Sequence, residues 1–211
     1  MIKENLNKIK STLPENVTLV AVSKTKPKED LKEAYDAGQR IFGENKIQEM
    51  VDKYDVLPKD IQWHMIGHLQ SNKVKYIAPF VSLIHGADSL KLLREINKRA
   101  TQNKRIIDCL LQIHIATESS KFGFGINEIE ETLIAVQEFK NINIKGLMGM
   151  ATFTNDRTQI RKEFSSLRMV FNQIKTHQIN TLSIGMSGDY QIAIENGSTM
   201  IRIGSAIFGT R

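Results

Sequence analysis

Short apolar runs alternate with stretches of helical period along the whole chain. The apolar runs have the length and the aliphatic, β-branched character of buried strands. We expect strands at 18–23, 41–43, 62–66, 81–84, 107–115, 144–150, 181–184 and 199–203. The intervening stretches predict amphipathic helices at 2–12, 30–37, 90–100 and 190–196. A further helix is expected to open at the capping-box pattern of residues 127–130 and to run to Phe139.

Eight strands separated by helices fit a single α/β (β/α)₈ TIM barrel better than an open sheet. Because few residues follow the last predicted strand, we expect the eighth outer helix to be missing from its usual place. We expect residues 2–12 to form a leading helix that packs on the barrel there. Gly38 is placed to terminate the helix before it. No Pro/Gly/Ser-rich linker interrupts the pattern, which predicts one domain over residues 1–211.

Composition narrows the class of protein. Hydrophobic residues make up 41% of the chain and charged residues 25%, as in an ordinary globular domain. No apolar run approaches the length of a membrane span, and the first residues include Glu4, unlike a signal peptide. The single cysteine, Cys109, lies in an apolar run, which predicts a buried free thiol. We therefore expect a cytoplasmic protein that does not bind membranes.

The net charge of +6 permits binding to anions. The lysines are spread among acids and lack interleaved aromatic residues, so we expect no nucleic-acid partner. His64 and His68 are four residues apart but straddle the end of a predicted strand. No cysteine or acid accompanies them at metal-ligand spacing, and we predict no metal site.

Lys24 ends the first predicted strand and opens a polar loop. An amine at the carboxyl end of an apolar strand is partly removed from water, and such lysines can act as nucleophiles that form Schiff bases. The signal is weak by itself, because most lysines at strand ends are simply solvated. It gains weight from the anion-binding candidates near the other end of the chain.

In a barrel of this type, residues just after each strand converge on one face. Lys24, Asn45, Lys121, Ser187 and the segment 202–205 occupy such positions. Ser187 precedes a predicted helix, where it either caps that helix or offers its hydroxyl to an anion, and the residues alone leave these alternatives even. Gly204 and Ser205 repeat the pattern after strand eight. A reactive lysine with a phosphate cradle suggests pyridoxal 5'-phosphate.

Arg202 lies within an apolar run, where a bare guanidinium would be costly. The commoner outcome is a salt bridge, to Glu195 or Asp189. The functional alternative pairs Arg202 with a ring nitrogen of the cofactor. Because arginine stays charged, that nitrogen would remain unprotonated, which weakens the ring as an electron sink.

Six motifs carry a resemblance to a known family. They are residues 21–27 (AVSKTKP), 42–45 (FGEN), 63–73 (WHMIGHLQSNK), 146–148 (GLM), 185–187 (GMS) and 202–209 (RIGSAIFG). Together, and in this order, they resemble the YggS/PROSC family of pyridoxal phosphate homeostasis proteins over nearly the whole chain. The motifs together are highly specific.

The resemblance implies a barrel like the amino-terminal domain of alanine racemase. It further implies that Lys24 forms a Schiff base with pyridoxal 5'-phosphate and that Arg202 faces the pyridine nitrogen. The residues that match the remaining cofactor-binding positions are Asn45, Met186, Ser187, Gly204 and Ser205. The family has no established turnover, so the protein is expected to act in vitamin B6 homeostasis as a monomeric carrier, with apo-enzymes as candidate partners.

Two enzymatic alternatives remain open. One is a pyridoxal-phosphate-dependent amino-acid racemase, although none of the tyrosines has an evident role as its base. The other is a cofactor-free barrel of the aldolase kind, in which a lysine Schiff base acts on a phosphorylated sugar.

Overall fold

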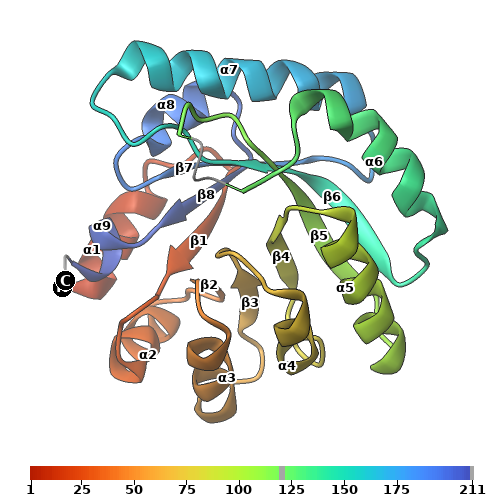
Figure 1. Ribbon diagram of the computed structural model, residues 1–211. Helices are drawn as coiled ribbons and strands as arrows, with labels where there is room; N and C mark the ends of the chain where they lie inside the picture. Colours follow the sequence, from red (N-terminus) through yellow and green to blue (C-terminus); the bar gives the residue numbers. More distant parts are fainter. Residues whose placement is uncertain (119–121, 210–211) are drawn as a thin grey trace.

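Eight parallel strands follow one another in chain order around a closed barrel, in which β1 pairs with both β2 and β8 (Figure 1). The computed structural model describes residues 1–118 and 122–209. The strands are β1 Thr18–Val22, β2 Ile41–Glu44, β3 Gln62–Met65, β4 Leu83–Ala87, β5 Ile107–Ile113, β6 Ile142–Gly149, β7 Thr181–Met186 and β8 Met200–Ile203. The predicted α/β barrel is confirmed, and every strand overlaps its predicted range.

The helices lie outside the strands and cover the barrel wall (Figure 1). They are α1 Ile2–Lys10, α2 Lys28–Asp36, α3 Ile47–Val56, α4 Val74–Ile77, α5 Leu90–Gln102, α6 Ile129–Ala135, α7 Arg157–Ile174, α8 Tyr190–Glu195 and α9 Ser205–Phe208. Single turns of 3₁₀ helix occur at η1 Ser71–Lys73, η2 Ile126–Glu128 and η3 Val136–Glu138. Each α-helix presents apolar side chains to the strands, because burying that face is the main source of helix stability in a folded protein.

Two helix ends can be compared directly with the ends that the sequence predicted. Gly38 has a φ of +88° and ends α2 as predicted, with its N–H donating to the Tyr35 carbonyl. The predicted capping box at 127–130 is displaced by two residues. The Glu128 carboxylate instead accepts the Gly125 N–H at 2.6 Å, and the helix that follows is divided between η2, α6 and η3.

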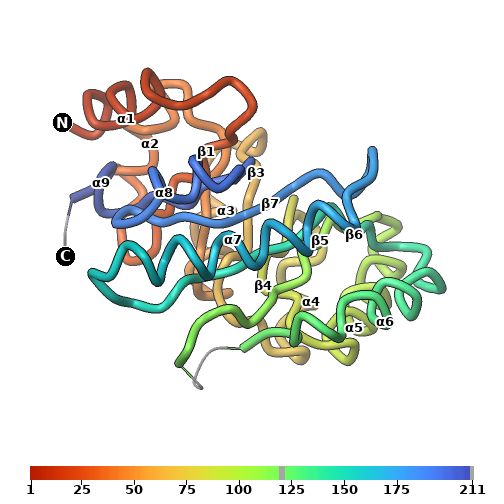
Figure 2. Tube along the Cα trace, turned by 90° about the horizontal axis from the view of Figure 1, so that it is seen from above, coloured from red at the N-terminus to blue at the C-terminus, as the bar shows by residue number. Residues whose placement is uncertain are grey.

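The leading helix α1 lies beside α9, on the same side of the barrel (Figure 2). Asn5 donates its side-chain amide to the Ile207 carbonyl at 3.1 Å, joining the two ends of the chain. Ile2, Leu6 and Ile9 form the buried stripe of α1, as the amphipathic pattern indicates. In this place α1 lies against α2 as well as α9.

The apolar core has two parts. The larger part fills the space between the strands and the outer helices. The smaller part lies among the inward-facing strand residues and consists of Val20, Leu83, Leu110, Met148 and Met200. The barrel is therefore a packed core rather than a pore. Cys109 is buried and free, and none of the helices in the described ranges is long and apolar enough to span a membrane.

Candidate functional site

A pocket of about 560 Å³ opens at the carboxyl ends of the strands. All of the residues that the sequence predicted for cofactor binding line it: Lys24, Asn45, Met186, Ser187, Arg202, Gly204 and Ser205. They come from the ends of β1, β2, β7 and β8, which the closed barrel brings together. Lys121, which the barrel pattern placed on the same face, lies outside the described residues.

The ionisable side chains that line this pocket carry more positive than negative charge. They are Lys24, Lys26, Arg202 and Asp189. The Lys24 side chain is partly buried, and its amine donates to no hydrogen-bond acceptor within the described parts of the chain. The Lys26 amine donates to the Phe208 carbonyl at 3.0 Å. A pocket with this charge favours a small anionic ligand.

One end of the pocket gathers hydrogen-bond donors from the loops after β7 and β8. The Ser187 hydroxyl oxygen accepts the Gly204 N–H at 3.2 Å, which ties the two loops together. The amides of Ser205 and Ala206 open the first turn of α9, and in the described structure they donate to no other residue. Free amides and serine hydroxyls in these two loops are typical of barrel phosphate sites.

Ser187 does not cap α8, which was the alternative role for this residue. That helix begins at Tyr190, with Asp189 at its N-cap position. The Asp189 carboxylate accepts the Met186 N–H at 2.5 Å, and the Ser187 hydroxyl bonds to the neighbouring loop instead. The Ser187 side chain is thus directed to the junction of the two loops.

Asn45 is held at the pocket by a close approach of two backbones. A Cβ atom at Gly67 would lie 2.5 Å from the Asn45 carbonyl oxygen, closer than real contacts allow. Only glycine therefore permits the loop after β3 to pack on the end of β2. This contact sets the position from which the partly buried Asn45 reaches the pocket.

Arg202 is buried, and its guanidinium donates to neutral oxygens from β6 and β7. These are the Gly149 carbonyl at 3.0 Å, the Ser183 carbonyl at 2.9 Å and the Ser183 hydroxyl. Burial lowers the pKa of Arg202 to about 10, against the opposing influence of the Asp189 charge, so the side chain remains a cation at neutral pH. Of the two carboxylates expected as salt-bridge partners, Glu195 pairs instead with Arg161 at 2.6 Å. The charge of the other, Asp189, does act favourably on Arg202.

A charged cluster that sequence reasoning missed fixes the backbone on both sides of Lys24. We call Glu44, Glu49 and Lys53 the lysine clamp. The Lys53 amine donates to Glu44 and Glu49, each at 2.7 Å, and to the Ser23 carbonyl at 2.8 Å. Glu49 also accepts the Thr25 N–H at 2.5 Å. The only advance signal was the i,i+4 spacing of Glu49 and Lys53 on a helix.

The clamp has two unusual features. Thr25 adopts a φ of +64°, a left-handed conformation that is costly for a residue with a Cβ. Glu44 is fully buried, and one of its carboxylate oxygens has no hydrogen-bond partner among the described residues. Burial raises the pKa of Glu44, although Lys53 and the Ser23 hydroxyl act in the opposite direction.

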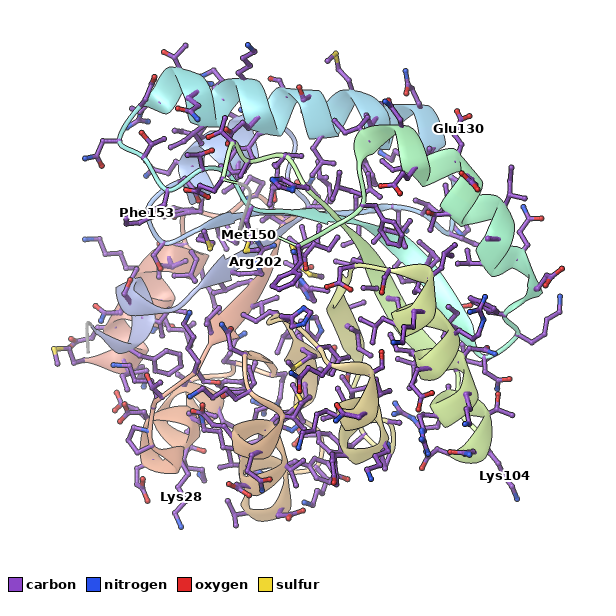
Figure 3. All side chains as sticks on the ribbon, in the orientation of Figure 1. Lys28, Lys104, Glu130, Met150, Phe153 and Arg202 are labelled. Carbon is purple, nitrogen blue, oxygen red and sulfur yellow. The ribbon has the colours of Figure 1, made fainter. Side chains whose placement is uncertain are left out.

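The loop after β6 forms a further wall of the pocket that the sequence did not indicate. Met150, Phe153 and Asn155 all line the cavity. Met150 and Arg202 lie near the centre of the barrel, whereas Phe153 reaches outward from the rim and is 95% exposed (Figure 3). Within the described residues, no three histidine, cysteine or carboxylate side chains gather as a metal site would require.

Comparison with known proteins matches the whole chain to one family. The family model for the alanine racemase N-terminal domain covers residues 1–211. A pyridoxal phosphate homeostasis protein of Pasteurella multocida is 38% identical, over 100% of this chain and 97% of its own length. A protein of the same name from Escherichia coli K12 is 40% identical, over 94% of this chain and 87% of its own length.

A solved structure gives the same result for the fold. PipY of Synechococcus elongatus PCC7942, with PLP bound, superposes with a TM-score of 0.90 at 32% sequence identity. The match covers 99% of this chain and 100% of that one.

Proposed function

We propose a function from the premise that the chain belongs to the alanine racemase N-terminal domain family and, within it, to the pyridoxal phosphate homeostasis proteins. The protein binds pyridoxal 5'-phosphate and acts in the homeostasis of that cofactor. The observation that carries this proposal is the convergence of the Lys24 amine, the Arg202 guanidinium and the donors around Ser187 and Ser205 on one pocket.

The chemistry of the donor set fits this ligand. Pyridoxal phosphate has an aldehyde, an aromatic nitrogen and a phosphate, and when bound it supplies a carbonyl for amines and an electron-accepting ring. The phosphate would take the hydroxyls of Ser187 and Ser205 and the amides of Ser205 and Ala206. Lys24 would hold the aldehyde carbon as a Schiff base, in which the amine adds to the carbonyl and one water leaves. Arg202 would face the ring nitrogen, with Asn45 and Met186 along the ring.

A carrier agrees with this site better than an amino-acid racemase. Racemisation needs a second acid–base group opposite the lysine, and the described lining contains no tyrosine, histidine or cysteine. The Asp189 carboxylate is already engaged by the Met186 N–H. A charged Arg202 at the ring nitrogen would also keep that nitrogen unprotonated and weaken the electron sink. We propose that the protein stores and delivers the cofactor without turnover.

Partners and compartment follow as parts of the same proposal. We propose that the protein acts as a monomer. The free, buried Cys109 fits a reducing compartment, and we propose the cytoplasm. Apo-enzymes that need pyridoxal phosphate are the proposed recipients.

Replacement of the proposed anchor tests the assignment. Wild-type protein mixed with pyridoxal phosphate is expected to develop the visible absorption of a Schiff base, and Lys24→Ala is expected to abolish it. Borohydride reduction followed by peptide mass spectrometry should place the resulting secondary amine on Lys24. The matched control is Lys28→Ala, because Lys28 is exposed and points away from the barrel (Figure 3).

Two results would contradict the proposal. A wild-type protein that takes up no pyridoxal phosphate would refute cofactor binding itself. Exchange of amino-acid α-protons in deuterated water at an enzymatic rate would refute the carrier and favour the racemase alternative.

A further inference from the structure

A chain of buried hydrogen bonds crosses the barrel interior beneath the pocket. We call His64, His85 and Ser183, together with Arg202, the polar relay. His64 Nδ1 lies 3.0 Å from His85 Nε2, and His85 Nδ1 lies 3.1 Å from the Ser183 hydroxyl oxygen. That oxygen also accepts a hydrogen bond from Arg202. All four side chains are buried, and they come from β3, β4, β7 and β8.

The chemistry of Arg202 fixes the direction of every hydrogen bond in the relay. A guanidinium can only donate, so the Ser183 oxygen must accept from it. The Ser183 hydroxyl hydrogen is then satisfied only if it is donated to His85 Nδ1. A histidine that accepts at Nδ1 and is neutral carries its proton on Nε2, which is therefore donated to His64 Nδ1. The opposite direction would leave the buried Ser183 hydrogen without an acceptor, which is costly.

The same logic fixes the charge of the relay. A protonated His64 would present a second hydrogen to the His85 N–H, and a protonated His85 would place a cation beside Arg202. Burial lowers the pKa of His64 to about 3 and that of His85 well below its usual range, so both rings are neutral at neutral pH. Arg202 is thereby held by neutral acceptors and retains its positive charge toward the pocket.

We propose that His64, His85 and Ser183 are positioning residues for Arg202, which act as a neutral relay with a single tautomer and a single hydrogen-bond direction. This inference rests on the proposed function, since the group positioned is the one assigned to the aromatic nitrogen of pyridoxal phosphate. The relay orients the guanidinium without cancelling its charge, as a carboxylate partner would. The bound ring then meets a cation whose hydrogen-bond acceptors among the described residues are neutral oxygens.

The position of the relay in the barrel indicates that its residues do more than fill the interior. The inward-facing layer next to it, Val20, Leu83, Leu110, Met148 and Met200, is apolar and fills the interior without hydrogen bonds. Apolar side chains would serve equally well for stability at the level of the relay, since buried polar groups gain little over them. The polar residues of the relay lead instead to Arg202, a charged side chain that lines the pocket.

The first test needs neither a variant nor the cofactor. Nitrogen-15 NMR of the labelled wild-type protein at neutral pH should show His64 and His85 as neutral rings protonated on Nε2. A proton on Nδ1 of His85, or an imidazolium at either position, would overturn the relay. This measurement stands even if pyridoxal phosphate does not bind, so it separates the inference from the proposed function.

The second test reads the effect on the bound cofactor. His85→Leu should weaken pyridoxal phosphate binding about tenfold and shift the absorption maximum of the cofactor that is retained. His85→Asn, whose amide oxygen can accept from Ser183 in place of Nδ1, should restore much of both. The control is His177→Gln, because His177 is exposed, whereas the histidines of the relay are buried. A folded His85→Leu protein with an unchanged spectrum and affinity would refute the proposal.

Discussion

Two buried polar clusters support the two ends of the site, and they are built on opposite principles. The lysine clamp lies between the barrel wall and α3 and consists of opposite charges in contact. The polar relay lies inside the barrel and consists of neutral groups that end on a cation. The clamp holds backbone on either side of Lys24, whereas the relay holds the side chain of Arg202.

The difference follows from what each cluster supports. The clamp must fix the path of residues 23–25, and an ammonium with three hydrogens can join three oxygens from different elements. Within the clamp, the single Lys53 cation is paired with both carboxylates. The relay supports a charge that the ligand must meet, so a carboxylate there would compete with the ligand. The clamp therefore fixes geometry with opposite charges in contact, whereas the relay supports a cation with neutral groups.

The largest effect is expected when the clamp loses its cation. Lys53→Met leaves the carboxylates of Glu44 and Glu49 without their central partner, and breaking a buried pair in this way typically costs about 3–5 kcal/mol. Urea denaturation should show the loss in the free energy of unfolding. Glu44→Gln in the same chain should recover part of it, because the buried negative charge is then removed.

An exposed pair gives the matched control. Lys32 and Asp36 have the same i,i+4 spacing as Glu49 and Lys53, but both side chains are about half exposed. Lys32→Met should change the free energy of unfolding by less than about 1 kcal/mol. If Lys53→Met were equally mild, the clamp would not be a stabilising charged cluster.

A change of pH should separate the relay from the clamp. The folded-state pKa of His64 is about 3, below its usual value of 6.5. Between these two pH values His64 is protonated in the unfolded chain and neutral in the folded protein. The contribution of His64 is therefore fully present above pH 6.5 and is lost as the pH falls toward 3. Over this range the free energy of unfolding should fall by about 1.4 kcal/mol for each pH unit. Urea denaturation of the wild type and of His64→Gln, each at about pH 7 and about pH 5, measures this loss of stability.

The clamp acts in the opposite sense, because Glu44 has a raised pKa and its protonation favours the folded state as the pH falls. That contribution is common to both proteins and cancels in their difference. His64→Gln should thus lose stability less steeply than wild type. Equal slopes would show that folding does not lower the pKa of His64, which would contradict a ring held neutral by burial in the relay.

The smallest effect on stability is expected at Thr25, whose left-handed backbone the clamp maintains. Thr25→Gly relieves the steric cost but adds flexibility to the unfolded chain, so the free energy of unfolding should change by less than about 1 kcal/mol. The rate at which Lys24 combines with pyridoxal phosphate should nevertheless fall several-fold, because the loop is freer. Stopped-flow absorbance measures this rate.

Lys104 provides a control with the same backbone conformation away from the site. It has a φ of +53°, is exposed, and lies far from the pocket (Figure 3). Lys104→Gly should leave the rate of Schiff-base formation unchanged. A similar rate for Thr25→Gly and Lys104→Gly would show that the clamp serves stability alone.

Much of the fold could be predicted because its signals are local. Each strand is an apolar run, and Gly38 marks the end of α2 by a conformation that only glycine adopts freely. The capping box was displaced because several acids near Glu128 satisfy the same short pattern, and only the backbone decides which one is used. Lys24, Ser187 and Arg202 were found because they follow, or interrupt, apolar strands.

The sequence by itself determined the barrel, the face on which the pocket lies and part of its lining, since strand order fixes which residues follow each strand. It did not determine that Ser187 joins two loops, that Arg202 donates to oxygens of β6 and β7, or that Lys53 and His85 support the site. Those contacts join residues far apart in the chain, such as His85 and Ser183. Their pairing depends on which side chains closure of the barrel brings within hydrogen-bonding distance, and burial then makes an unpaired polar group too costly to leave.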